Sequence, residues 1–205
     1  MELIAASRIV KAQQRAQAAG PYARELTRAV SAVATFSNVD HPLTTEHPNP
    51  KRAAVLLITS DRGQAGAYSS SVIREGERLH QLLREDSKEI VPYLSGRKGI
   101  AYYTFRQREV AQSWSGDSDN PSFDRAKEIA DSLIEAFLKP TEEGGVDEIH
   151  VVFTRFVSML TQRPDVIRLL PLEVVEGTEA ASAEPKKKGG RKERNRAKKS
   201  SASAA

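Results

Sequence analysis

The first 37 residues carry an apolar pattern that is typical of one long helix. Apolar side chains recur in alternating steps of four and three residues over four heptads, at Ala5, Ile9, Ala12, Ala16, Ala19, Ala23, Leu26, Val30 and Val33. The surrounding residues are good helix formers, interrupted by Gly20-Pro21. At about 1.5 Å per residue the helix would reach roughly 55 Å, more than the width of a small domain. We expect residues 1–37 to form half of a coiled coil or a helix lying across the domain surface.

A different pattern follows a proline-rich linker, which we place at residues 38–52. The stretch 53–59, apolar up to Ile58, is typical of a strand that is covered on both faces. Beyond it, further strands are predicted at 89–95, 109–114, 149–153 and 167–175, the last as an edge strand, and helices at 69–85, at 97–105 and after Asn120-Pro121. This alternation predicts an α/β domain over residues 53–176 with a mostly parallel sheet.

The last of these helices has a start signal and an apolar face of its own. Asn120 is predicted as the N-cap, with Pro121 at the first helical position. The helix is expected to bury Phe123, Ala126, Ala130, Leu133 and Phe137.

Charge is distributed unevenly between the tail and the rest of the chain. Residues 185–205 hold nine Lys or Arg and one acid, a net of +8, so residues 1–184 carry 22 bases and 26 acids, a net of −4. We expect residues 177–205 to be a disordered basic tail that binds polyanions non-specifically. The tail lacks aromatic residues for base stacking, so we expect no specific nucleic-acid binding.

Composition excludes several classes of protein. The chain has no cysteine, which excludes disulfide scaffolds, cysteine nucleophiles and cysteine-ligated metals. The longest apolar run has six residues, whereas a membrane-spanning helix needs about 20. The first residues do not resemble a signal peptide, so we expect a soluble, intracellular chain.

The loop after the first strand is the place where an α/β sheet could bind a ligand. Residues 59–68 include Ser60, Asp61, Arg62, Gly63 and Gly66, and they lie where the carboxyl end of a parallel strand enters a helix. The glycine patterns that bind phosphates are missing, so we expect no nucleotide cofactor here.

The four histidines also fail to form a site. His41 and His47 flank a proline-rich loop, and His80 is expected on a helix surface. We expect Glu148 and His150 to point to opposite faces of a strand, so that they cannot act as a dyad. No spacing typical of a metal site occurs, and we expect no metal and no catalytic residue.

Ordered motifs along residues 1–175 resemble the gamma-subunit family of the bacterial rotary, proton-translocating ATP synthase. They are MELIAASRIVKAQ from Met1, PYA from Pro21, SDRG from Ser60 with Gly66, FVSMLTQ from Phe156 and LLPL from Leu169. The amino-acid sequence around residues 96–99 and 103–106 is similar to that of actinobacterial members of this family.

The resemblance implies a non-catalytic central rotor shaft that couples proton flow to ATP synthesis and regulates ATPase activity. Two long antiparallel helices would lie inside the ring of alpha and beta subunits. A Rossmann-like α/β domain would lie at the foot against the epsilon subunit and the c-subunit ring, on the cytoplasmic face of the plasma membrane. A chain that failed to assemble would be free in the cytoplasm.

Partner contacts carry over from the resemblance to named positions. Met1 matches a methionine near the contact between shaft and catalytic subunits, and Arg8 and Lys11 are candidates for facing acidic loops of the ring. Ser60, Asp61, Arg62, Gly63 and Gly66 would shape the base of the α/β domain. Family members begin upstream of Met1 and close with a second long helix, so we expect this chain to lack both segments and to transmit less than full torque.

Two other readings remain open from the residues alone. One is a small α/β protein that binds RNA or an anionic surface through its cationic tail and dimerises through its long helix. The other is a nucleotide-dependent enzyme that uses the crevice beside Asp61.

Overall fold

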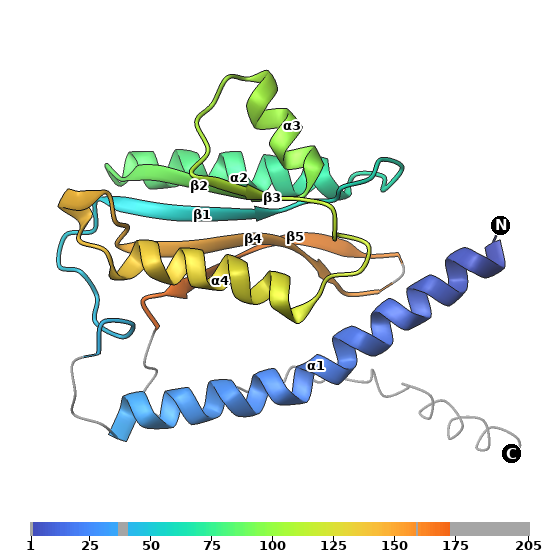
Figure 1. The fold of residues 1–205 in the computed structure, drawn as a ribbon, viewed down its shortest axis with the longest axis horizontal. Coiled ribbons are helices and arrows are strands. Elements are labelled where there is room, and N and C mark those ends of the chain that lie inside the picture. Colours follow the sequence, from blue (N-terminus) through green and yellow to red (C-terminus); the bar gives the residue numbers. More distant parts are fainter. Residues whose placement is uncertain (1, 37–40, 159, 173–205) are drawn as a thin grey trace, which may run out of the picture. The chain divides into compact units, whose positions relative to one another are not determined.

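The computed structural model describes residues 2–36, 41–158 and 160–172, and it begins with the long helix that the heptad pattern predicts. Helix α1 (Glu2–Phe36) remains helical through Pro21 (Figure 1). Of its described side chains, those of the seam are exposed: Ile9 is 37% exposed, Leu26 51% and Val30 40%. The seam therefore finds no covering partner within the described part of this chain.

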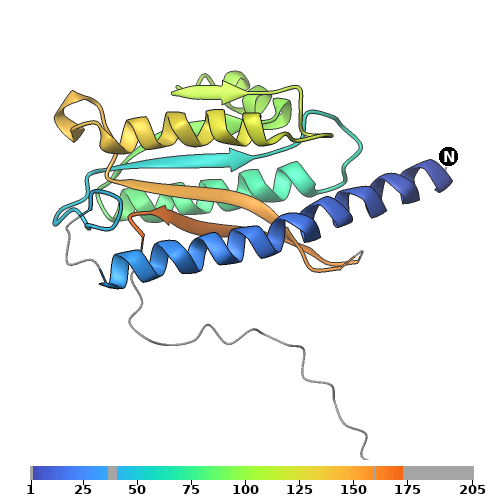
Figure 2. The ribbon, with the colours of Figure 1, turned by 60° about the horizontal axis from the view of Figure 1, so that its bottom comes forward.

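The remaining elements form one five-stranded sheet with helices on both faces (Figures 1 and 2). The elements after α1 are β1 (Arg52–Ile58), α2 (Tyr68–Glu85), β2 (Glu89–Ser95), α3 (Arg97–Phe105), β3 (Gln112–Trp114), α4 (Phe123–Leu138), a 3-10 turn (Thr141–Glu143), β4 (Glu148–Phe156) and β5 (Gln162–Leu170). Strands follow the order β3-β2-β1-β4-β5. All pairs are parallel except β4 with β5. The predicted α/β class with a mostly parallel sheet is confirmed.

The core divides along the alternation of β1. Ala53, Val55 and Leu57 pack with α2 and α3, whereas Ala54 and Leu56 pack with Leu133 of α4. These β1 residues are at most 4% exposed, so the strand is covered on both faces, as its apolar run predicts.

Several predicted boundaries are wrong. The N-cap of α4 is Ser122, whose hydroxyl accepts a hydrogen bond from the Arg125 amide at 3.2 Å, and not Asn120. Strand β3 covers only the last part of its predicted range. Strand β5 ends before Pro171 and begins earlier than predicted, with Pro164 tolerated because β5 is an edge strand.

The predicted buried face of α4 is also largely wrong. Leu133 is buried and Phe137 is half-buried, but Ala126 and Ala130 are exposed and Phe123 is 77% exposed. The sheet covers a narrower stripe of this helix than its periodicity suggests. The two alanines border an apolar cavity of about 400 Å³ between α4 and strands β4 and β5.

Candidate functional site

The loop after β1 combines left-handed backbone conformations with local hydrogen bonds. Gln64 and Gly66 adopt φ angles of 60° and 56°, a conformation that glycine adopts readily and other residues adopt rarely. The Ser60 hydroxyl lies 2.8 Å from that of Ser69 at the start of α2 and donates to the Arg62 carbonyl at 2.9 Å. The loop is thereby tied to the helix that it enters.

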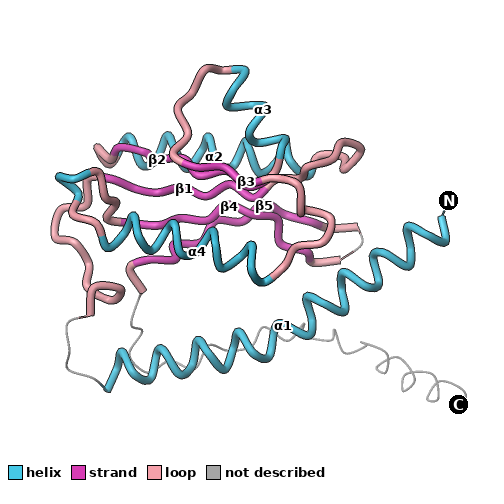
Figure 3. Tube along the Cα trace, in the orientation of Figure 1, coloured by secondary structure: helices cyan, strands magenta, loops and turns pink. Residues whose placement is uncertain are grey.

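Asp61 connects this loop with two others. Its carboxylate accepts hydrogen bonds from the backbone amides of Arg97 at 3.0 Å, Gly116 at 2.9 Å and Ser118 at 2.9 Å. Partial burial would raise the pKa of Asp61, but these donors and the Ser118 hydroxyl outweigh it, so the pKa is lowered. These amides follow β2 and β3, whose carboxyl ends lie at the same edge of the sheet as that of β1 (Figure 3).

Three basic side chains near Asp61 face solvent. Arg62 is largely exposed and pairs with Asp119 at 2.7 Å, and Arg97 and Lys98 are exposed at the start of α3. A Cβ placed on Gly63 would lie 3.7 Å from the Lys98 ammonium nitrogen. The fold therefore brings Ser60, Asp61, Arg62, Gly63 and Gly66 together at one edge of the sheet.

The other predicted site residues belong to the shaft helix. Arg8 and Lys11 are exposed on α1. Met1 lies outside the described residues, as do residues 177–205 of the predicted tail.

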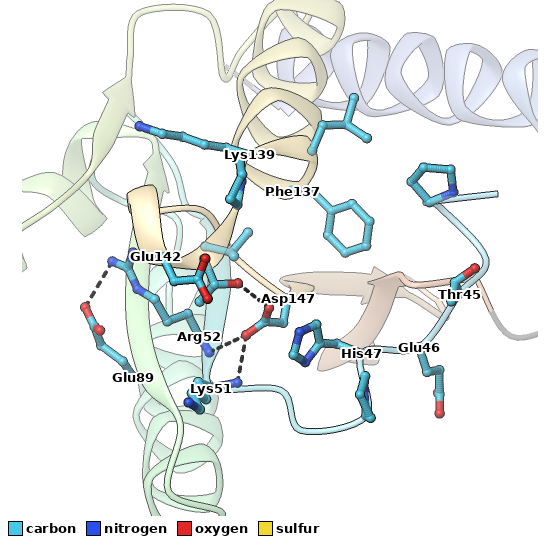
Figure 4. Close-up of a pocket in the computed structure, with 16 residues that line it drawn as sticks. Thr45, Glu46, His47, Lys51, Arg52, Glu89, Phe137, Lys139, Glu142 and Asp147 are labelled. Atoms are coloured by element: carbon cyan, nitrogen blue, oxygen red, sulfur yellow. Dashed lines mark hydrogen bonds and ion pairs between the residues drawn. The ribbon is translucent and has the colours of Figure 1, made fainter. Parts of the chain in front are cut away.

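A cavity of about 740 Å³ lies at the opposite, amino edge of the sheet (Figure 4). Its centre is Asp147, whose carboxylate accepts from the amides of Lys51 at 2.7 Å and Arg52 at 2.9 Å and from the Thr141 hydroxyl at 2.5 Å. Arg52 in turn pairs with Glu89 at 3.0 Å. The sequence predicts only a loop at residues 41–50 and gives no indication of this cavity, because the residue at its centre is a single aspartate just before a strand.

His80 is buried, with 3% of its surface exposed, so the prediction that it lies on a helix surface is wrong. Its ring lies edge-on to Tyr103, with the ring centroids 6.3 Å apart. Burial lowers the pKa of His80 to about 4, aided by Arg84 and Arg108 and opposed by Glu77. The imidazole is therefore neutral at pH 7.

The side chains of Glu148 and His150 are hydrogen-bonded to each other, contrary to the prediction that they point to opposite faces. Residues two apart on a strand share a face, so the expectation of opposite faces is wrong. The His150 Nε2 lies 3.0 Å from the Glu148 carboxylate, which also accepts from the Lys88 ammonium at 2.9 Å. Hydrogen bonding to His150 and to Lys88 outweighs burial and lowers the pKa of Glu148 to about 2. Lys88, Glu148 and His150 therefore form one buried hydrogen-bonded group, and none of the three has a fully buried side-chain polar atom without a partner.

Among the described residues, no group of three or more His, Asp or Glu side chains could hold a metal ion. In the same ranges, no helix is long and apolar enough to cross a membrane.

Comparisons with known proteins agree on one family. A family model described as ATP synthase matches residues 1–202. The ATP synthase gamma chain of Nocardioides sp. is 65% identical over 184 residues, which are 90% of this chain and 61% of the relative. That of Acidothermus cellulolyticus is 66% identical over 179 residues, 87% of this chain and 60% of the relative. The chain thus spans about 60% of the length of these curated relatives.

A solved structure shares the fold. The central stalk and c-ring of the Tetrahymena thermophila mitochondrial ATP synthase includes a chain that matches with a TM-score of 0.50 at 21% identity. The match covers 73% of this chain and 59% of that one. At this identity the likeness concerns the fold alone.

Proposed function

Since this chain belongs to the ATP synthase gamma-chain family, we propose that it acts as a central-stalk subunit that couples rotation to catalysis in other subunits. Its partners would be the alpha and beta subunits of the catalytic ring, the epsilon subunit and the c-subunit ring. The subunit would be non-catalytic and peripheral, on the cytoplasmic face of the bacterial plasma membrane. The observation that carries the proposal is the 65% identity to a gamma chain over 184 residues.

Each segment of the chain has its own role in this proposal. Residues 1–37 would be the shaft helix, 38–52 a linker, 53–176 the α/β domain that supports the shaft, and 177–205 the basic tail. Exposure of Ile9, Leu26 and Val30 supports a shaft whose apolar seam meets another chain, because apolar side chains at heptad spacing are stable when covered. Arg8 and Lys11 would face the ring from the same helix.

The mechanism requires no chemistry from this chain. An asymmetric shaft contacts each catalytic site differently as it turns, so it shifts the conformational equilibrium of sites that it never joins covalently. The rigid sheet behind α1 would transmit force from the membrane sector. The alternative of an RNA-binding protein is not favoured by the family match.

Co-assembly tests the proposal. The full chain is mixed with alpha and beta subunits of a related actinobacterial enzyme, and complex formation and ATP hydrolysis are measured. We expect a stoichiometric complex that Leu26→Asp weakens, whereas Glu25→Gln, an exposed change beside the seam, leaves it intact. Absence of any complex, or equal effects of the two variants, would count against the shaft assignment.

A further inference from the structure

Asp61 occupies a position that open α/β sheets commonly use for anionic ligands. Such ligands bind outside the carboxyl ends of the strands, where the N-terminus of a helix presents free amides. Here the amide at that position, Arg97 N at the start of α3, donates to the Asp61 Oδ1 at 3.0 Å. The negative charge at the helix start is supplied by the chain itself.

Two further donors come from a separate segment. The amides of Gly116 and Ser118, in the loop after β3, both donate to the Asp61 Oδ2 at 2.9 Å. The Asp61 amide returns a hydrogen bond to the Ser118 hydroxyl at 2.8 Å. Gly116 has a φ of 107°, which a residue with a Cβ adopts only under strain. One carboxylate therefore joins the ends of the neighbouring strands β1, β2 and β3.

We propose that Asp61 is the positioning residue of this edge: its carboxylate is a built-in anion that fixes three loops in the arrangement they present to a partner. The inference rests on the proposed function, since only the resemblance to the gamma-subunit family places Ser60, Asp61, Arg62, Gly63 and Gly66 among the partner contacts. It changes the role of Asp61, which turns inward and holds the loops, while Arg62, Arg97 and Lys98 remain exposed for contact. An external phosphate would meet the charge of Asp61 at these amides, so the same residue opposes nucleotide binding.

The test replaces the built-in anion with a free one. Amide hydrogen exchange is measured on the full chain for Asp61→Gly and Asp61→Asn, with and without formate, which carries the same functional group. Asp119→Asn is the matched control, because it removes an equal charge nearby that pairs with the Arg62 side chain and accepts from none of these three amides.

We expect Asp61→Gly to speed exchange at Arg97, Gly116 and Ser118 by about fivefold or more, and formate to restore protection at these three sites. Asp61→Asn should give a smaller increase, and Asp119→Asn none. Two results would overturn the proposal. One is exchange that is unchanged in both Asp61 variants, and the other is formate that slows exchange as much in the native chain as in Asp61→Gly. Because no partner is present, either result leaves the shaft assignment to the co-assembly experiment.

Discussion

The Glu148 carboxylate accepts a hydrogen bond from the Nε2 of His150 at 3.0 Å, two residues along the same strand and on the same face of the sheet. Lys88, whose side chain is 14% exposed, approaches the same carboxylate at 2.9 Å. This buried trio links the start of β2 to the start of β4 across the sheet. Removing one member leaves the others in a site with little water.

Glu148→Gln should destabilise the fold by about 2 to 4 kcal/mol, because the Lys88 ammonium, whose side chain is 14% exposed, then keeps only the exposed Asp86 carboxylate at 3.9 Å as a counter-charge. Glu89→Gln is the control, since Glu89 pairs with Arg52 but its side chain is 63% exposed, and it should cost less than about 1 kcal/mol. Urea unfolding of the full chain measures both. Equal losses for the two variants would show that the buried pair adds nothing beyond a surface pair.

Because His80 is buried in its neutral form, we expect the free energy of unfolding to fall in mild acid. Its pKa is about 4 in the folded chain, against 6.5 for an unperturbed histidine, so between these values the unfolded chain binds more protons. The contribution is complete above pH 6.5 and declines as the pH falls toward 4, by at most about 3 kcal/mol. Unfolding free energies measured from about pH 7 to about pH 4.5 should fall more steeply for the native chain than for His80→Phe. Parallel curves would contradict the burial of a neutral histidine.

The contact between α2 and β1 leaves no room for a side chain at Gly76. A Cβ at this position would lie 2.7 Å from the Leu57 Cδ2, and Leu57 is fully buried and cannot move aside freely. Gly76→Ala should therefore cost about 1 to 3 kcal/mol despite the better helix propensity of alanine. Gly20→Ala in α1, where the nearest atom is the end of Arg24 at 4.0 Å, should instead raise the helix content seen by circular dichroism. A stabilising Gly76→Ala would refute this packing.

The elements that were predicted well are those whose pattern is decided locally. The heptad spacing of α1 and the apolar run of β1 each determine one conformation, and both elements lie within a residue or so of the predicted ranges. The loops at the carboxyl edge could be placed as well, because parallel strands end at one side of a sheet.

The errors come from features that depend on neighbours. His80 follows Gly76 by four residues and precedes Leu83 by three, so it lies on the buried stripe of α2, but its polarity suggested the surface. Asn120 and Ser122 are both good caps, and only the path of the chain decides between them. The donors to Asp61 lie 36 to 57 residues away, so sequence alone could not reveal that its carboxylate turns inward.

Protection of α1 by the catalytic ring tests the central claim most directly. Because the chain has no cysteine, Leu26→Cys and Phe105→Cys each introduce a single reactive thiol, at positions that are 51% and 87% exposed in the native chain. The rate of maleimide labelling is compared with and without alpha and beta subunits. The shaft assignment predicts that labelling slows by about tenfold or more at position 26 and stays unchanged at position 105. Unchanged labelling at position 26 in a formed complex would contradict it.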